Sequence, residues 1–419
     1  MAASMLREML ISQDFCELRV ALCEDKQLVE LYVQPAKRSV VGNIYLGKVS
    51  DVLPGMQAAF VDIGLEQNAY LSIDDLRHEG APLSAGQAIS RHVQVGQTLM
   101  VQVVKDATDS KGARVTMELS IPGRFLVLFP NSNRRGVSKK IAEDRRQQLL
   151  QLMQQELPAG MGAIARSAAQ GAAQADIQAD IALLMSSYQR VKQQSTQLRA
   201  PSILHSESDL AMRCVRDMFT ADFDSLTIDD QQTYDKVVAL VKRYAPQLLT
   251  RVRLQCSTKQ PLFSRYGIED AIAAALKREV PLPSGGSIVI DQTEALVSID
   301  VNTGSFIGSR TLEETLLTTN LEAAEVATRQ MRLRDVGGII IIDFIDMESD
   351  HNKEKLQTLL RDLLTRDPAR TKLLGLNSLG LAEITRKNTA DGLSRLAREI
   401  CPHCEGQGRL LLSPLGKRS

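Results

Sequence analysis

Two apolar runs that each end in a carboxylate, separated by a long helical pattern, constrain the fold of this chain more than any other feature. The first run ends at Asp300, with Asn302 two positions later, and the second run holds four consecutive isoleucines and ends at Asp343. We expect the isoleucine run to form a strand that is buried on both faces. Residues 312–331, between the two runs, predict an amphipathic helix. The strand–helix–strand order predicts a parallel or mixed sheet in an α/β domain.

The polar residues at the ends of these runs predict a magnesium site. Because residues i and i+2 of a strand share a face, Asp300 and Asn302 would point the same way. They converge with Asp343 if the two strands are neighbours. Two carboxylates and an amide oxygen form a hard, oxygen-rich ligand set that suits Mg²⁺. The alternative is that each Asp caps a helix or forms a turn, and the pattern alone leaves both interpretations open.

Several motifs of the chain resemble the RNase E/RNase G family of bacterial endoribonucleases, and more closely its RNase G branch. They are SIDVNTGSF, TNLEAAE, RLRDVGGIIIIDFIDM and, near the end, CPHCEGQG. The resemblance covers nearly the whole chain. It implies that Asp300 and Asp343 bind a catalytic Mg²⁺ and that Asn302 orients the Asp343 side chain. Asp346 would lie just outside these metal ligands.

The resemblance also implies a multidomain α/β fold in which two domains are inserted into a third. Residues 1–36 show short alternating runs that are too small to form a core and must join a later segment. Family members usually continue into a small C-terminal domain, which we expect this chain to lack. The expected parts are an RNase H-like subdomain (1–36 and 211–276), an OB-fold RNA-binding domain (37–118), a 5′-end sensor domain (119–210), a DNase I-like catalytic domain (277–398), and a zinc link with a tail (399–419).

The expected OB-fold domain contains short strand patterns broken by glycine and proline, as in a five-stranded barrel. Phe60 and Tyr70 fall on successive strands and are candidates for a base-stacking platform. Lys105, Lys111 and Arg114 are candidate phosphate contacts. The alternative places Phe60 in the barrel core. In the resembled family, the positions of Phe60, Tyr70 and Lys111 line the RNA channel, and Tyr70 replaces a Phe found in some members.

In the expected sensor domain, the resemblance implies a pocket for the 5′-monophosphate of RNA. The segment ARSAAQG matches the family pattern RTAxxG. Arg166 would grip phosphate in a bidentate way, and the Ser167 hydroxyl, in place of the usual Thr, would donate beside it. Gly123 would contribute its backbone to this pocket, and Val127 would form part of the pocket wall. Without the resemblance, this Arg-Ser pair would be interpreted as a solvated turn.

The cysteines predict a zinc link rather than a disulfide scaffold. Cys401 and Cys404 form the single CxxC motif, and His403 between them is poorly placed for the same ion. Since structural zinc takes four ligands, a site needs two chains, as a two-fold dimer supplies. The resembled family shares zinc between protomers in this way; a redox motif or an empty turn are the alternatives. The four remaining cysteines are expected to be buried thiols: Cys16, Cys23, Cys214 and Cys256.

The composition limits the kind of nucleic-acid site that the chain can have. The 419 residues include 50 basic and 50 acidic ones, so an RNA site must be a local patch rather than a globally basic surface. No apolar run reaches the length of a membrane span, and the N-terminus lacks a signal-peptide pattern. We therefore expect a cytoplasmic protein of about two to four domains.

Together with the resemblance, these features predict a Mg²⁺-dependent endoribonuclease that acts on single-stranded RNA. The resemblance implies 5′-phosphate and 3′-hydroxyl products, stimulation by a 5′-monophosphate, a role in rRNA and tRNA processing and mRNA decay, and a homodimer. Arg386 and Lys387 are further candidates for contacts near the scissile bond, although lone charges are more often surface residues. One alternative is an RNA-binding protein without turnover, against which the intact Asp300, Asn302 and Asp343 argue. The other is a phosphodiesterase for small nucleotides, for which an OB-fold domain is superfluous.

Overall fold

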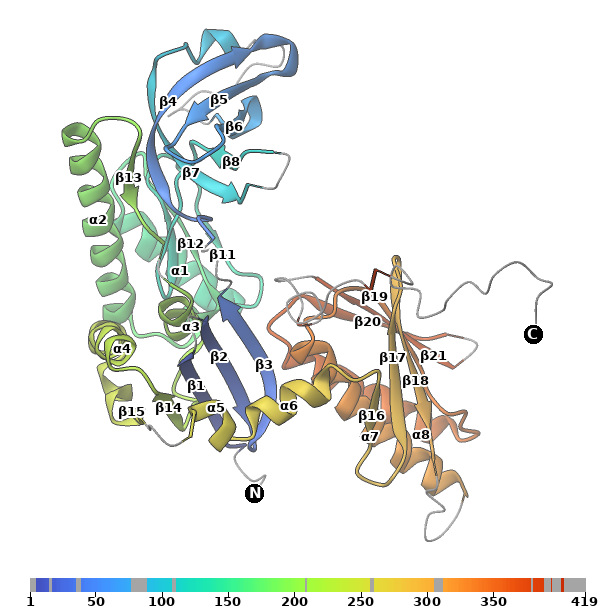
Figure 1. Cartoon of the computed structure of the whole chain (residues 1–419). Helices are drawn as coiled ribbons and strands as arrows, with labels where there is room; N and C mark the ends of the chain where they lie inside the picture. The colour runs from blue at the N-terminus through green and yellow to red at the C-terminus, as the bar shows by residue number, and fades with distance from the viewer. Residues whose placement is uncertain are drawn as a thin grey trace.

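The computed structural model shows a mixed α/β chain whose described residues form four β-sheets, one of them a small closed barrel (Figure 1). The barrel lies at the top of the N-terminal half, above a five-stranded sheet, and the C-terminal half is built on a six-stranded sheet beside them. The structure describes residues 5–14, 17–34, 39–76, 89–107, 111–207, 209–256, 260–304, 312–377, 380–387, 393 and 401–402.

The five-stranded sheet joins the N-terminal strands to a distant part of the chain. Its order is β15 (Val252–Leu254), β14 (Ser225–Ile228), β1 (Arg7–Asp14), β2 (Glu17–Glu24) and β3 (Gln27–Gln34). β1 to β3 are antiparallel, whereas β14 runs parallel to β1, with Met9 opposite Leu226. The N-terminal piece, expected to need a later segment, thus shares its sheet with one. Helices α3 (Leu210–Met218) and α4 (Gln231–Tyr244) pack on the sheet and begin at the capping carboxylates of Asp209 and Asp230.

The barrel closes on itself. Its strands follow the order β4 (Ile44–Leu53), β5 (Ala58–Asp62), β6 (Ala69–Ser72), β8 (Arg114–Thr116) and β7 (Thr98–Lys105), and β7 pairs back with β4. All pairs are antiparallel except β6 with β8. Alternate residues such as Val61, Leu71 and Val115 fill the interior, so their neighbours along each strand face outward. β13 (Ser202–His205) extends the sheet beside β4.

A small sheet and two helices lie next to the barrel. The sheet order is β11 (Gly136–Val137), β12 (Gly162–Ala165), β10 (Leu126–Phe129) and β9 (Ile121–Pro122), and the helices are α1 (Glu143–Glu156) and α2 (Gln174–Gln197). Asp180 of α2 is buried, and its carboxylate accepts N–H groups from Phe125 (2.8 Å) and Leu126 (3.0 Å). This carboxylate therefore fixes the start of β10 against the helix. Short 3₁₀ turns occur at Pro54–Met56, Ile73–Asp75, Ile89–Arg91, Ser167–Gln170 and Pro246–Arg251.

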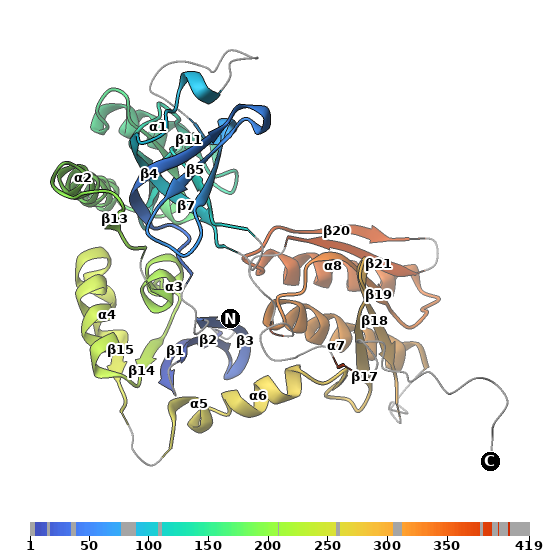
Figure 2. The same ribbon diagram turned by 45° about the horizontal axis from the view of Figure 1, so that its top comes forward.

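The C-terminal sheet is mixed, as the strand–helix–strand pattern predicts. Its order is β16 (Glu279–Pro281), β17 (Ser287–Gln292), β18 (Leu296–Asn302), β19 (Gly338–Asp343), β21 (Leu381–Arg386) and β20 (Thr371–Leu376), and only β18 and β19 are parallel. Helices α7 (Leu312–Leu333) and α8 (Asp350–Thr365) cover one face (Figure 2).

The isoleucine strand is not buried on both faces, which corrects the expectation from sequence. Ile340 and Ile342 are buried beneath the helices, whereas Ile339 is 51% exposed. The reason is that α7 and α8 pack on one face only, so every second residue of β19 lies on the open face. The polar ends of β18 and β19 therefore have an uncovered surface beside them.

A charged contact joins the two halves of the chain. Arg332, in the last turn of α7, donates to the carboxylates of Glu24 (3.1 Å) and Glu30 (2.7 Å) on the five-stranded sheet. Helices α5 (Leu262–Arg265) and α6 (Ile268–Ala275) connect the halves and pack against the same sheet. No helix within the described residues combines the length and apolar character needed to cross a membrane.

The cysteines follow the expectation in part. Cys23 and Cys214 are buried, and burial raises the pKa of the Cys23 thiol to about 12. Cys256 is exposed, contrary to prediction, because it follows β15 at the point where the chain leaves the sheet. Cys16 lies outside the described residues.

Candidate functional site

Two carboxylates meet on the open face of the C-terminal sheet. β18 and β19 are neighbours, and Asp300 lies directly opposite Asp343 in their register. Adjacent strands are about 4.8 Å apart, and directly opposite residues share a face, so the two side chains project side by side. Both are exposed, while Ile299 and Ile342 beside them point into the core under the helices. The geometry required by the sequence argument is therefore present.

The amide of Asn302 completes the group, but with a different partner from the one expected. Its Nδ2 donates to Oδ2 of Asp300 at 2.8 Å, whereas the family resemblance expects it to orient Asp343. The reason is geometric: Asn302 shares a face with Asp300 on its own strand but lies only diagonally across from Asp343. Within the described residues, the Asp343 carboxylate has no hydrogen-bond or ion-pair partner, which leaves it open to a ligand.

This group fits magnesium by its chemistry. The described residues contain no cluster of three or more His, Cys, Asp and Glu side chains that could enclose a metal. Mg²⁺ does not need such a cage, because it commonly keeps several waters and takes one or two carboxylates together with substrate phosphate oxygens. Asp300 and Asp343 supply such a pair of carboxylates on an exposed surface.

The segment after β19 is held by a residue that sequence analysis did not single out. Asn320 of α7 is fully buried, and its amide both donates to the Ile345 carbonyl (2.8 Å) and accepts the Ile345 N–H (3.0 Å). Glu313, at the start of the same helix, accepts N–H groups from Ser349 (3.1 Å) and from the Asn352 side chain (3.0 Å). The available signal was an Asn on the apolar stripe of an amphipathic helix, where a buried amide needs a partner.

Arg386 and Lys387 lie away from the carboxylate pair, which corrects their assignment to the scissile region. In the β19–β21 register Asp343 lies opposite Leu381, whereas Arg386 lies opposite Gly338 at the other end of the strand. Arg386 is 5% exposed and forms ion pairs with Asp367 (2.8 Å) and Asp335 (2.7 Å). Lys387 is exposed beside it. Arg386 is therefore a structural residue of the sheet.

The expected aromatic pair forms on the outer surface of the barrel. Phe60 of β5 lies opposite Tyr70 of β6, with ring centroids 6.3 Å apart and ring planes at 69°. Both rings are half-buried, while Ala59, Val61 and Leu71 point inward. Phe60 thus does not belong to the barrel core, and the edge-to-face pair leaves aromatic surface at the outside of the barrel.

The same surface carries the predicted cations. Arg114 lies opposite Tyr70 on the next strand, and Lys105 lies opposite Arg114. Both are exposed, and so is Lys111, which precedes β8. Arg114 donates to the Asp75 carboxylate at 2.8 Å, so part of its charge is already compensated. Lys105 and Lys111 remain the stronger candidates for phosphate contacts.

The predicted sensor residues also meet, but around a carboxylate. Nη1 of Arg166 donates to the Gly123 carbonyl (2.8 Å) and to Asp217 of α3 (2.7 Å). Val127 lies opposite Ile164, two residues before Arg166, and Ser167 is exposed at the start of a 3₁₀ turn. Burial raises the pKa of the Asp217 carboxyl, but hydrogen bonds from Arg216 and Arg166 outweigh burial and hold that pKa below its ordinary value. Arg166 therefore faces an ionised carboxylate.

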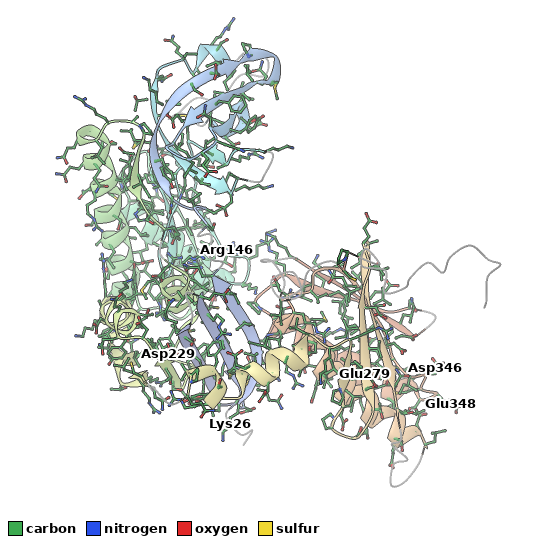
Figure 3. The ribbon with its side chains drawn as sticks, viewed as in Figure 1. Lys26, Arg146, Asp229, Glu279, Asp346 and Glu348 are labelled. Atoms are coloured by element: carbon green, nitrogen blue, oxygen red, sulfur yellow. The ribbon has the colours of Figure 1, made fainter. Side chains whose placement is uncertain are left out.

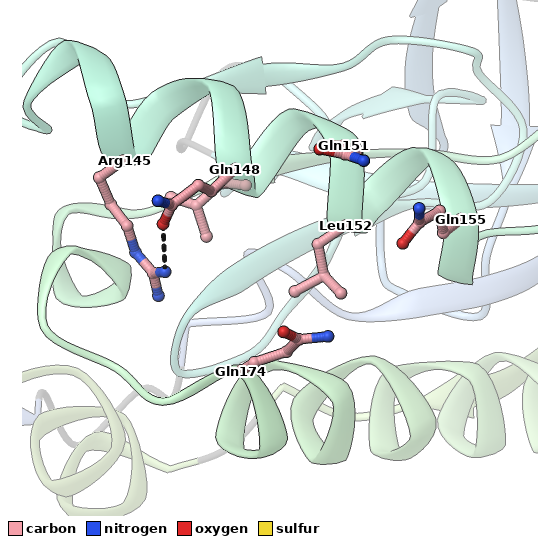
Figure 4. Close-up of a pocket in the computed structure, with 7 residues that line it drawn as sticks. Arg145, Gln148, Gln151, Leu152, Gln155 and Gln174 are labelled. Carbon is pink, nitrogen blue, oxygen red and sulfur yellow. Dashed lines mark hydrogen bonds between the residues drawn. The ribbon is translucent and has the colours of Figure 1, made fainter.

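A separate cavity between α1 and α2 carries no catalytic chemistry. It has a volume of about 240 Å³ and is lined mainly by glutamines, among them Gln148 and Gln174 (Figure 4). Arg145 in its wall donates to the carbonyls of Ala169 (3.4 Å) and Ala172 (2.5 Å), so its guanidinium holds the chain between α1 and α2 in place.

At the end of the chain Cys401 is exposed, and Cys404 and His403 lie outside the described residues, so the zinc link stays a prediction.

Comparison with known proteins gives one consistent result. A model described as "Ribonuclease E/G family" matches residues 120–389. Ribonuclease G of Escherichia coli (strain K12) is 38% identical over 413 residues, which cover 96% of this chain and 84% of that protein. Ribonuclease G of Haemophilus influenzae is 38% identical over 412 residues, with the same shares of 96% and 84%. Ribonuclease E of Escherichia coli (strain K12) is 36% identical over 404 residues, which cover 94% of this chain and 38% of that protein.

Proposed function

Because this chain belongs to the Ribonuclease E/G family and is an endoribonuclease, we propose that it uses Mg²⁺ to hydrolyse single-stranded RNA to 5′-phosphate and 3′-hydroxyl ends. The observation that carries the proposal is the direct opposition of Asp300 and Asp343 on the open face of the C-terminal sheet. A stimulatory 5′-monophosphate and a role in rRNA and tRNA processing and mRNA decay belong to the same proposal.

The residues of the site have distinct tasks in this proposal. Asp300 and Asp343 hold the ion, and the hydrogen bond from Asn302 fixes the rotamer of Asp300. When bound, the ion supplies charge compensation for the phosphate and a more acidic water. The exposure of both carboxylates lets an extended RNA strand pass over the sheet. The buried isoleucines beneath keep the two strands in register, which holds the carboxylates at a fixed separation.

The sheet topologies support the expected division into domains. The strand order and the closing pair of the barrel are those expected of an OB fold, which commonly binds single-stranded nucleic acid. Three antiparallel strands extended by two parallel ones support an RNase H-like scaffold built from residues 1–36 and 211–276. The two-layer C-terminal unit is proposed as the DNase I-like catalytic domain.

The sensor is proposed to work by exchange of partners. Arg166 is paired with Asp217, and a 5′-monophosphate brings more negative charge and more acceptor oxygens than a carboxylate. We expect the phosphate to take over Arg166 while the Ser167 hydroxyl and the backbone at Gly123 line the pocket. We further propose that Cys401 and Cys404 of two protomers share a structural Zn²⁺ in a homodimer.

A cleavage assay with controlled metal tests the main proposal. A 5′-monophosphorylated single-stranded oligoribonucleotide is incubated with the chain in Mg²⁺ and in EDTA, and RNA binding is measured separately in EDTA. We expect internal cleavage that requires Mg²⁺, products with 5′-phosphate ends, and binding that persists without the metal. Binding without cleavage at any Mg²⁺ concentration would replace the proposal by a non-catalytic RNA-binding function. Cleavage in EDTA would show that the reaction does not need Mg²⁺.

The aromatic surface of the barrel gives a second expected result. Replacing Tyr70 by Ala should weaken binding of single-stranded RNA by about 1–3 kcal/mol, because one stacking ring is lost. Tyr70→Phe is the matched control and should bind as the parent does, since either ring stacks. Fluorescence anisotropy at fixed salt measures both. Equal affinity of Tyr70→Ala and the parent would show that RNA does not use this surface.

A further inference from the structure

A cavity opens where β19 ends, and none of the functions above uses it. It has a volume of about 380 Å³ and lies between the segment Phe344–Met347, helix α8, and the residues Leu376, Asn377 and Gly380 near the ends of β20 and β21. Asp346 is on the side of the C-terminal half that faces away from the barrel (Figure 3). Because residues advance by at most about 3.6 Å each, Asp346 is within roughly 11 Å of Asp343 along the chain. The cavity is therefore a neighbour of the proposed metal pair.

Two side chains of α7 hold the chain segment that forms one wall of this cavity. The buried amide of Asn320 binds both backbone groups of Ile345, and the Glu313 carboxylate binds the N–H of Ser349 and the side chain of Asn352. The wall is thus fixed at both ends by side chains of α7. Such support is what a binding site needs in order to select one geometry.

The lining combines an apolar floor with a charged rim. Phe344, Met347 and Leu356 form the floor and are buried. The rim carries the Asp346 carboxylate and the Lys353 ammonium. A Cβ atom built on Gly380 would lie 3.4 Å from an Asp346 oxygen, so this carboxylate faces across the cavity mouth. Within the described residues Asp346 has no hydrogen-bond or ion-pair partner, and Lys353 forms an ion pair at 3.4 Å with the exposed Asp350.

We propose that this cavity is a nucleobase subsite, which holds one unstacked base of the RNA strand next to the scissile phosphate. The inference rests on the proposed function, because it places the strand at Asp343. A base has apolar faces that pack on a floor of Phe, Met and Leu, and edges that carry N–H donors and carbonyl acceptors. The Asp346 carboxylate accepts from a base N–H, and the Lys353 ammonium donates to a carbonyl or ring nitrogen. The volume falls within the usual range of small-ligand sites.

Abasic scanning tests this subsite. Each nucleotide of a short single-stranded oligoribonucleotide is replaced in turn by an abasic one, and the affinity in EDTA and the cleavage rate in Mg²⁺ are measured for the parent and for Asp346→Asn. We expect one position at which the abasic change weakens parent binding about tenfold. At that position the change should matter less in Asp346→Asn, because the neutral amide oxygen is a weaker acceptor for the base N–H than the carboxylate is. Lys353→Gln is the second variant. In it, the abasic change at the same position should also cause a smaller loss of affinity than in the parent.

The controls separate this inference from the proposed function. Asp362→Asn changes an exposed carboxylate of α8 outside this cavity and should show the parent's abasic profile. Methylation of the ring N–H of the sensitive base should weaken binding to the parent more than it weakens binding to Asp346→Asn, because the lost hydrogen bond is charge-assisted only in the parent. If the abasic profiles in EDTA of parent and Asp346→Asn coincide, the subsite is wrong. If the parent binds with the expected coupling but cleaves nothing in Mg²⁺, the subsite stands and the proposed hydrolysis fails.

Discussion

Replacing Asp343 by Asn is expected to lower RNA cleavage by about a thousandfold or more, with RNA binding unchanged. The amide keeps the shape of the side chain but removes one of the two negative charges that face each other across β18 and β19. Asp300→Asn should have the same effect for the same reason. Since the two carboxylates act as one unit, the double variant should be hardly worse than either single one. Single-turnover cleavage of an oligoribonucleotide in Mg²⁺ measures the loss.

The control for these variants is an acidic residue in the same domain but outside the site. Asp362→Asn removes an exposed carboxylate on α8 and should cleave at the rate of the parent. Binding of RNA in EDTA, measured for every variant, distinguishes lost chemistry from lost affinity. An Asp343→Asn variant that cleaves within tenfold of the parent would exclude the carboxylate pair as the catalytic centre.

The second large effect is expected on stability. Arg386→Ala should destabilise the C-terminal half by about 3–5 kcal/mol, because the buried carboxylate of Asp367 loses its ion pair. Asp335 loses its 2.7 Å contact as well. Lys387→Ala is a matched control, since the next side chain is exposed and should change stability by less than about 0.5 kcal/mol. Scanning calorimetry of the three proteins at pH 7 measures the difference. Equal stability of both variants would contradict a structural role for Arg386.

The effect of Arg386 should depend on pH. Burial raises the pKa of the Asp367 carboxyl, but hydrogen bonds from Arg386 and Thr371 more than offset it, so the net pKa is below the ordinary 3.8. A carboxyl with a lowered folded-state pKa stabilises the fold above its unfolded pKa and loses that contribution as the pH falls through the folded value. The difference between Arg386→Ala and the parent should therefore be full at neutral pH and shrink only in strong acid.

Local patterns in the sequence were sufficient for the pairs that depend on strand periodicity. Asp300 and Asn302 share a face because strands alternate, and the long helix between the two runs made β18 and β19 parallel neighbours. Phe60 and Tyr70 pair for a similar reason, since a short turn joins two successive antiparallel strands. In each case, the relevant geometry is set within a short stretch of chain or within one crossover.

Contacts between distant side chains were not accessible in this way. Arg386 has the appearance of a surface cation in the sequence, and only the packing of the loop that holds Asp367 makes it a buried partner. The role of Asn320 is likewise not visible in the sequence, because its partner Ile345 reaches it only when the segment after β19 packs against α7. The exposure of Ile339 depends on which face the helices cover, and a run of four isoleucines does not contain that information.

The pairing of β1 with β14 has a consequence for how the chain folds while the ribosome synthesises it. The N–H of Arg7 donates to Asp224, which is 217 positions later, so the central pair of this sheet cannot form until that residue has been synthesised. At about 5–20 residues per second, the first three strands wait roughly 10–40 s for their partner. The barrel and the small sheet are complete earlier and can fold first. During that interval the edge of β1 that later pairs with β14 is unpaired, and such an edge can pair with another strand or another nascent chain.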